Sequence, residues 1–180
     1  MTYAIRPARP DEAGLIVEIE DQAADLFAVF GLAQVADMPT GDRAFYDACI
    51  AAGTVWVAVP AGQSAPIGFA AAAVRDHALW LAELAVLPAH GRRGVGGRLM
   101  RTVIDWATRR RLPAVELTTF RDLPFNAPFY ARLGFTPFEP GADRPHLAGI
   151  RRNEIARGLD ALQPRQAMRL RLSLPDPAAP

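Results

Sequence analysis

The sequence predicts a mixed α/β (α+β) fold in which a mostly antiparallel central sheet is flanked by helices. In the first half, short apolar segments separated by turn residues favour strands joined by hairpins. In the second half, a long segment of helical periodicity lies between two strands, which predicts a parallel crossover unit. Because the chain has 180 residues without an internal repeat or linker, we expect one domain over 1–174 and a flexible C-terminal tail over 175–180.

The first third of the chain predicts an edge strand and two helices. Residues 3–9 form the expected edge strand, which Pro10 ends. An amphipathic helix begins at Asp11, where acidic side chains favour the first turn of a helix. Residues 27–40 are expected to be irregular, and a second helix covers about 42–52.

Three strands follow, and turn residues separate them. Residues 60–66 form a cluster of Pro, Gly and Ser, and Asp76-His77 marks a second turn. Hairpin connections of this kind predict antiparallel neighbours. The expected strands cover residues 54–59, 67–75 and 79–87.

The second half alternates helices with strands. A helix over 94–110 places Val95, Leu99, Val103 and Trp106 on one face. A second helix begins at or near Asn126 and ends at Gly134, a C-terminal glycine. The other expected elements are strands over 114–119, 135–138 and 166–174, a loop over 139–145 and a helix over 147–162.

Composition limits the function and the compartment. The formal net charge is +1, which argues against a general nucleic-acid binder. The three consecutive arginines, Arg109–Arg111, are explained by the C-terminus of a helix, where the helix dipole and solvent favour positive charge. We expect no membrane partner, because no apolar run approaches membrane-spanning length and the start lacks the apolar core of a signal peptide. The single Cys49 excludes an intramolecular disulfide, so a reducing, cytoplasmic location is expected.

A glycine-rich loop, Gly91-Arg92-Arg93-Gly94-Val95-Gly96-Gly97, lies between an expected strand and an expected helix. The first amides of a helix have no intrahelical partner, and the helix dipole adds positive potential there. Glycine lets the backbone approach an anion, so the loop predicts a phosphate site. The triphosphate P-loop needs a lysine, and all 20 basic residues here are arginine. The dinucleotide fingerprint needs a glycine where Leu99 stands.

Two segments in this order resemble motifs of the GNAT superfamily of N-acetyltransferases. Residues 84–100, which contain the loop, are similar to its central motif, and residues 126–135 are similar to the next one. The family pattern carries Gln or Arg where this chain has Gly91; Arg92 or Arg93 is the expected substitute. The resemblance implies direct transfer of an acetyl group from acetyl-CoA, as co-substrate and without a metal, to a primary amine of a small molecule or peptide.

The resemblance also implies roles for individual residues. The pyrophosphate is expected on Arg92, Arg93, Gly94, Val95, Gly96 and Gly97, and the pantetheine arm on Leu84, Ala85 and Val86. Asn126 is expected to cap its helix, to contact the pantetheine arm, or to do both. Tyr130 is the expected acid that protonates the leaving thiolate, and Glu83 is the expected base. Asp122 and His90 are alternative bases. His90 is also expected to be a polar surface residue of the loop.

The acceptor amine stays open. The acceptor region implied by the resemblance combines acids with aromatic residues, a pattern that also fits a solvated helix face over a core; its residues are Glu18, Glu20, Asp21, Asp25, Phe27, Phe30, Phe45 and Tyr46. A CoA-binding module without transferase activity, an acetyltransferase of protein N-termini or lysines, and a DNA-binding module are the alternatives. Because family members are frequently dimers, a homodimer is kept as an expectation.

Overall fold

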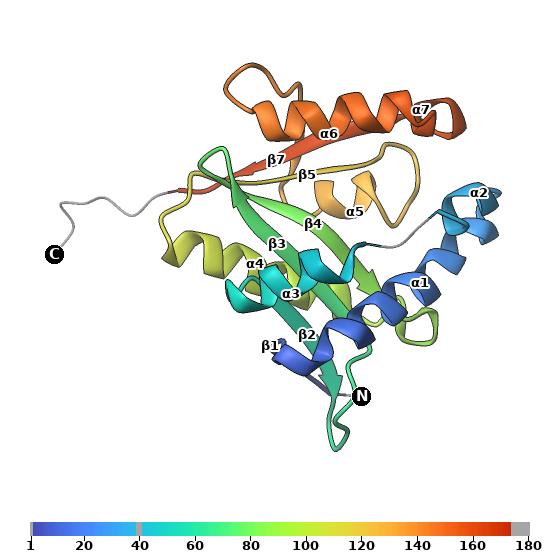
Figure 1. Cartoon of the computed structure of the whole chain (residues 1–180), viewed down its shortest axis with the longest axis vertical. Helices are drawn as coiled ribbons and strands as arrows, with labels where there is room; N and C mark the ends of the chain where they lie inside the picture. Colours follow the sequence, from blue (N-terminus) through green and yellow to red (C-terminus); the bar gives the residue numbers. More distant parts are fainter. Residues whose placement is uncertain (1, 39–40, 174–180) are drawn as a thin grey trace, which may run out of the picture. The chain divides into compact units, whose positions relative to one another are not determined.

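The computed structural model describes residues 2–38 and 41–173 (Figure 1). The chain divides into two compact units. Unit 1 consists of Met1–Ala73 and Ala82–Val103, and unit 2 consists of Val74–Leu81 and Ile104–Pro180. The expected flexible tail over 175–180 lies outside the described residues.

The first strands of unit 1 pair antiparallel. They are β1 (Tyr3–Pro7), β2 (Val55–Pro60) and β3 (Gly68–Arg75), whose last two residues belong to unit 2. β2 pairs antiparallel with β1 and with β3, in registers that place Ala58 opposite Ile5 and Gly68. Every residue of β2 is buried, which agrees with its β-branched composition. The antiparallel arrangement predicted for this half is confirmed.

The N-terminal part of unit 1 contains a 3-10 turn and three helices, and side-chain hydrogen bonds fix the first turn of two of these elements. The elements are the 3-10 turn η1 (Pro10–Glu12), α1 (Ala13–Val29), α2 (Ala33–Ala36) and α3 (Arg43–Ala51). The buried Glu12 carboxylate accepts hydrogen bonds from Arg6 and from the Arg9 amide. The Asp42 carboxylate accepts one from the Ala44 amide at 3.0 Å and caps α3. The irregular segment predicted over 27–40 is wrong in part, since α1 continues to Val29 and α2 follows.

Like β3, two further elements run through both units. They are β4 (Ala78–Val86) and α4 (Val95–Arg109), and the 3-10 turn η2 (Pro88–His90) lies between them. The face predicted for α4 is buried at Val95, Leu99 and Val103, whereas Trp106 is only half-buried. α4 therefore begins within one residue of the predicted start and packs through the predicted stripe.

Unit 2 contains the remaining strands and helices. They are β5 (Ala114–Phe120), α5 (Ala127–Ala131), β6 (Thr136–Phe138), α6 (Pro145–Ala156), α7 (Leu159–Leu162) and β7 (Arg165–Arg171). β4 pairs parallel with β5, with Leu79 opposite Val115, so the predicted crossover unit is confirmed. The single helix predicted over 147–162 is wrong: α6 and α7 are separated by Gly158, whose φ of 76° ends a helix.

The strands follow the order β1-β2-β3-β4-β5-β7-β6 in one seven-stranded sheet. β7 pairs antiparallel with both β5 and β6. Within unit 2, α6 contacts β5 and β7, over which it is drawn in orange in Figure 1. The mixed α/β fold with a mostly antiparallel sheet flanked by helices is therefore confirmed.

Buried carboxylates of unit 2 are bound by arginines. The Glu116 carboxylate accepts hydrogen bonds from Arg144 at 2.9 Å and from Arg169 at 2.7 Å. The Glu154 carboxylate accepts hydrogen bonds from Thr118, Arg151 and Arg165. Because an unpaired buried charge is costly, these pairs hold α6 and the segment before it against β5 and β7.

Candidate functional site

The glycine-rich loop of unit 1 changes from a 3-10 turn to a helix within a few residues. The Gly91 amide donates to the Pro88 carbonyl at 3.1 Å, and the Arg98 amide donates to the Gly94 carbonyl at 3.1 Å. The amides of Val95, Gly96 and Gly97 therefore precede the first of these helical hydrogen bonds. Such amides, together with the positive end of the helix dipole, favour an anion.

The backbone of this loop needs left-handed conformations and leaves open space. Gly94 has a φ of 79°, and Arg92 has a φ of 55°. A Cβ built at Gly94 or Gly97 would meet no atom within 4 Å, and residues 91–94 are exposed. An anion can therefore approach the loop without a clash with other side chains.

Gly91 departs from the family pattern for a local reason. A Cβ at Gly91 would lie 3.2 Å from the Pro88 carbonyl oxygen, the acceptor of the Gly91 amide. A longer side chain would therefore crowd the turn that Pro88 begins. Arg92 and Arg93 are both exposed beside it, as a substitute for the missing side chain requires.

The end of β4 carries the predicted base and the predicted pantetheine contacts. Glu83, Leu84 and Val86 are half-buried, whereas Ala85 is buried. The Glu83 carboxylate accepts a hydrogen bond from the Leu84 amide at 3.0 Å. Glu83 through Val86 and the glycine-rich loop lie in the same unit, so unit 1 holds one of the two predicted catalytic residues and most of the predicted contacts with acetyl-CoA.

Two residues of the predicted acceptor region bind each other. The Tyr46 hydroxyl donates to the Glu20 carboxylate at 2.7 Å, and the Gly41 amide donates to the same oxygen at 2.8 Å. Burial raises the pKa of Tyr46 far above its usual range, and the charges of Glu83 and Glu20 add to this effect. The Tyr46 hydroxyl therefore keeps its proton and acts as a donor. The interpretation of Tyr46 as a core residue is confirmed, because its side chain is buried against Phe69.

Asn126 and Tyr130 lie together at α5 in unit 2. Asn126 occupies the N-cap position, but its side chain makes no capping hydrogen bond, so the capping alternative is wrong. Its Oδ1 atom is buried and has no hydrogen-bond partner among the described residues. Tyr130 is buried, and its ring contacts Phe129 and Phe135. A buried acceptor atom is thus placed one helical turn from a phenol.

The two alternative bases are placed differently from Glu83. Both carboxylate oxygens of Asp122 bind Arg121, at 3.0 Å and 3.1 Å. This hydrogen-bonded pair lowers the pKa of Asp122, which makes Asp122 a weaker base. His90 lies in η2 and is half-buried, with its ring 6.3 Å from that of Tyr3, so it is exposed only in part.

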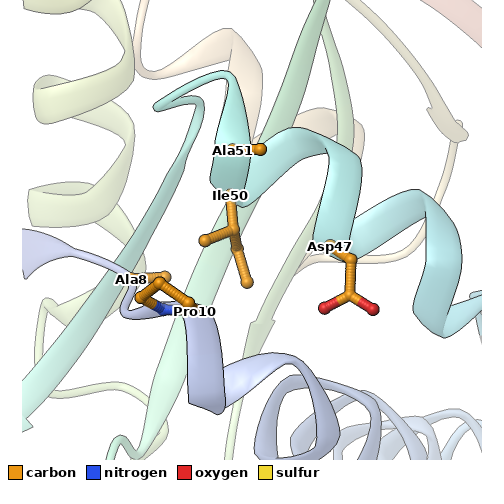
Figure 2. A pocket seen from close by; sticks show the side chains of 5 residues that line it. All are labelled: Ala8, Pro10, Asp47, Ile50 and Ala51. Carbon is orange, nitrogen blue, oxygen red and sulfur yellow. The ribbon is translucent and has the colours of Figure 1, made fainter.

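A separate hollow in unit 1 shares no residue with the predicted site. It lies between η1 and α3, and Figure 2 shows the Ile50 side chain and the Asp47 carboxylate at its edge. Its remaining lining residues are small: Ala8, Pro10 and Ala51. The hollow therefore offers one carboxylate and a few apolar atoms, which do not match the chemistry of a phosphate or a thioester.

Two further findings concern metals and membranes. Within residues 2–38 and 41–173, no three His, Cys, Asp or Glu side chains are grouped so that they could hold a metal ion. None of the helices in the described part of the chain combines the length and the apolar character that crossing a membrane requires.

A family comparison covers most of the site. The sequence model described as "Acetyltransferase (GNAT) family" matches residues 17–135, which is more than half of the chain. The match includes Glu83, the end of β4, the glycine-rich loop, Asn126 and Tyr130.

Solved structures support the fold. The ribosomal-protein-S18-alanine N-acetyltransferase from Escherichia coli is 16% identical, with a TM-score of 0.66 and 99% of each chain covered. Rv2747 from Mycobacterium tuberculosis, solved in complex with CoA, is 18% identical, with a TM-score of 0.69 and coverage of 94% of this chain and 99% of the other. The PaiA N-acetyltransferase from Thermoplasma acidophilum, in complex with coenzyme A, is 12% identical, with a TM-score of 0.68 and coverage of 96% and 100%.

Proposed function

The chain belongs to the acetyltransferase (GNAT) family and is an acetyl-CoA-dependent N-acetyltransferase; we propose that it acetylates a primary amine by direct transfer, with Glu83 as base and Tyr130 as acid. The observation that carries the proposal is the glycine-rich loop. The amides of Val95, Gly96 and Gly97 precede the first helical hydrogen bond, beside open space. This arrangement suits the pyrophosphate of CoA.

The residues present fit CoA at a second place. The buried Oδ1 of Asn126 has no donor among the described residues, and the pantetheine arm carries amide N–H groups that could supply one. We propose that Asn126 and the backbone of Leu84, Ala85 and Val86 hold this arm. Arg92, Arg93, Gly94, Val95, Gly96 and Gly97 hold the pyrophosphate in this proposal. The family match spans both units, which supports a single functional domain over 1–174.

Bound acetyl-CoA supplies a thioester whose carbonyl carbon accepts the amine nitrogen. An alkylamine has a pKa of about 10.4, so it must first lose a proton. Glu83 accepts this proton, directly or through a water molecule, and passes it to solvent. An amide near Val86 donates to the carbonyl oxygen while the C–N bond forms and the C–S bond breaks. Tyr130 gives its proton to the thiolate sulfur and regains one from the acylated nitrogen, so the products are the amide and free CoA.

The local structure of Glu83 supports its role. Its carboxylate is half-buried on β4 and accepts the amide of Leu84, so its position is held by its own strand. Asp122 is less suitable, because Arg121 occupies both of its carboxylate oxygens. A half-buried carboxylate that accepts the amide of the next residue can still take up a proton from an amine.

A thiol-release screen tests the proposed function. Purified protein is mixed with acetyl-CoA and with separate sets of monoamines, diamines, amino acids, peptides with a free N-terminus, and lysine peptides. Free CoA should appear with at least one set, and that set identifies the acceptor class. Tight acetyl-CoA binding without thiol release in any set would instead identify a CoA-binding module.

Two finer expectations belong to this proposal. A cytoplasmic location is supported by the use of acetyl-CoA and by the single cysteine, Cys49, which excludes an intramolecular disulfide. Localisation of a tagged chain tests it. A homodimer is the expected assembly, and light scattering on the purified chain tests it.

A further inference from the structure

Gly68, the first residue of β3, lies against the end of β4. A Cβ built at Gly68 would be 2.8 Å from the Ala85 carbonyl oxygen, 3.0 Å from Val86 Cγ2 and 3.1 Å from Val86 Cα. The next hydrogen bond joins the same segments, because the Leu87 amide donates to the Ile67 carbonyl at 2.9 Å. The backbones of β3 and β4 therefore approach each other at a place where no side chain fits.

The contact at Gly68 is closer than that of Gly91 with the Pro88 carbonyl oxygen, and it differs in kind from the surroundings of Gly41, Gly53 and Gly62. Gly53 and Gly62 have open space around the position of a Cβ, and Gly41 faces the side chain of Tyr46. Gly68 faces a backbone oxygen, which cannot rotate away as the end of a side chain can. Its φ lies outside the left-handed region, so alanine suits the local backbone, and only the neighbouring strand excludes it.

We infer that Gly68 is a positioning residue for the CoA-binding end of β4. This inference rests on the proposed function, in which the backbone of Ala85 and Val86 contacts the pantetheine arm. A Cβ at position 68 must displace the Ala85 carbonyl by several tenths of an ångström. Hydrogen-bond strength falls steeply with distance and angle, so the displaced strand end holds the pantetheine arm less well.

Gly68 was not among the residues predicted for the site, although a signal was present. A glycine inside or at the start of a strand often marks the close approach of another backbone. Gly68 is the second residue of the strand predicted over 67–75, which consists mostly of small residues, so its small size did not distinguish it. Its contact with Ala85 is a long-range contact that no local pattern shows.

The test compares two ligands on the Gly68→Ala variant. One is acetyl-CoA, and the other is adenosine 3′-phosphate 5′-diphosphate, which keeps the nucleotide and the pyrophosphate but lacks the pantetheine arm. Loss of about one hydrogen bond should weaken acetyl-CoA binding about tenfold. The fragment should bind the variant within about twofold of its parent value, because the glycine-rich loop is unchanged. Equal weakening of both ligands would overturn the inference.

Two control variants separate positioning from general destabilisation. Ala70→Val adds volume at a fully buried site of the same strand, opposite Trp56 of β2, and should lower stability while the ratio of the two affinities stays unchanged. The double variant Gly68→Ala with Val86→Ala removes the Cγ2 contact but leaves the contact of the new Cβ with the Ala85 carbonyl oxygen. The double variant should still bind acetyl-CoA weakly, and full recovery would contradict a backbone displacement.

One measurement needs no substitution. In nitrogen-15 NMR spectra of the unsubstituted protein, acetyl-CoA should shift the Gly68 amide signal, and the fragment without the pantetheine arm should not. If acetyl-CoA does not shift the Gly68 amide signal, the inference is overturned, even if the alanine variant does not fold. If the unsubstituted protein fails to bind acetyl-CoA, the proposed function fails; if it binds and only the Gly68 results are negative, the inference alone fails.

Discussion

The Tyr46 hydroxyl donates a hydrogen bond to Glu20 at 2.7 Å, across 26 residues of chain. The same carboxylate oxygen accepts the Gly41 amide at 2.8 Å. A Cβ at Gly41 would lie 2.6 Å from the Tyr46 hydroxyl, so the three groups are closely packed. One carboxylate thus ties α1 to the start of the segment that leads into α3.

We expect Tyr46→Phe to lower the free energy of unfolding by about 1.5–3 kcal/mol, the usual range for a hydrogen bond to a charged group. The ring contacts with Phe45 and Phe69 can stay, because only the hydroxyl is removed. Urea unfolding measures the change, with an unchanged m-value as the sign of an intact fold. Glu20→Gln, which keeps an acceptor oxygen, should cost less. A variant as stable as its parent would mean that this bond contributes no stability.

Asn126→Ala is expected to weaken acetyl-CoA binding and to leave the thermal midpoint nearly unchanged, because the Asn126 side chain makes no capping bond and its Oδ1 has no described partner. Calorimetry and thermal unfolding measure the two quantities. Asp42→Ala is the matched control, since Asp42 does cap α3. It should lose about 1 kcal/mol of stability without a change in acetyl-CoA affinity. Unchanged acetyl-CoA binding by Asn126→Ala would exclude the proposed contact.

Tyr130→Phe should reduce kcat about 10²–10⁴-fold, the usual contribution of a general acid, while the KM for acetyl-CoA changes little. The ring packs against Phe129 and Phe135, and phenylalanine preserves these contacts. Steady-state thiol release with the acceptor found in the screen measures both parameters. Turnover at the parent rate would remove Tyr130 from the mechanism.

Glu83→Gln is expected to shift or abolish the acid limb of the pH profile of kcat/KM, because this limb reports the ionisation of the base in the free enzyme. Asp122→Asn is the control. The pair with Arg121 lowers the pKa of Asp122, and its loss should leave the profile unchanged. An acid limb that stays in place in Glu83→Gln would exclude Glu83 as the base.

Much of the fold could be predicted because local patterns carry it. The hairpin strands, the parallel β4–β5 pair and the buried stripe of α4 all follow from periodicity and turn residues. The errors lie where glycine decides a helix end. Gly31, with a φ of 78°, follows the longer α1, and Gly158, with a φ of 76°, divides the helix predicted over 147–162. Both glycines were visible as possible C-terminal signals.

In the candidate site, too, local patterns predict some parts, whereas contacts between distant segments could not be predicted. The glycine-rich loop and α5 are continuous segments, so the local sequence was sufficient to predict roles for their residues. The Tyr46–Glu20 hydrogen bond and the approach of Gly68 to Ala85 join segments that are far apart in the chain. Local sequence patterns do not predict such contacts. The capping alternative for Asn126 failed because its backbone, with φ of −110° and ψ of −114°, departs from the extended conformation that capping residues adopt.

Glu154 is buried and accepts hydrogen bonds from Thr118, Arg151 and Arg165. Burial alone raises the pKa of Glu154, but the charge of Arg165 and the three donors outweigh it and hold the pKa below its usual value. A depressed pKa in the folded state gives stability that is present above the unfolded value of about 4.3 and is lost as the pH falls through the folded value. The free energy of unfolding should therefore decrease below about pH 4, and Glu154→Gln should flatten this decrease. Glu139→Gln, at an exposed glutamate, is the control and should keep the parent slope. Identical slopes for the parent and Glu154→Gln would show that the arginines do not set the ionisation of Glu154.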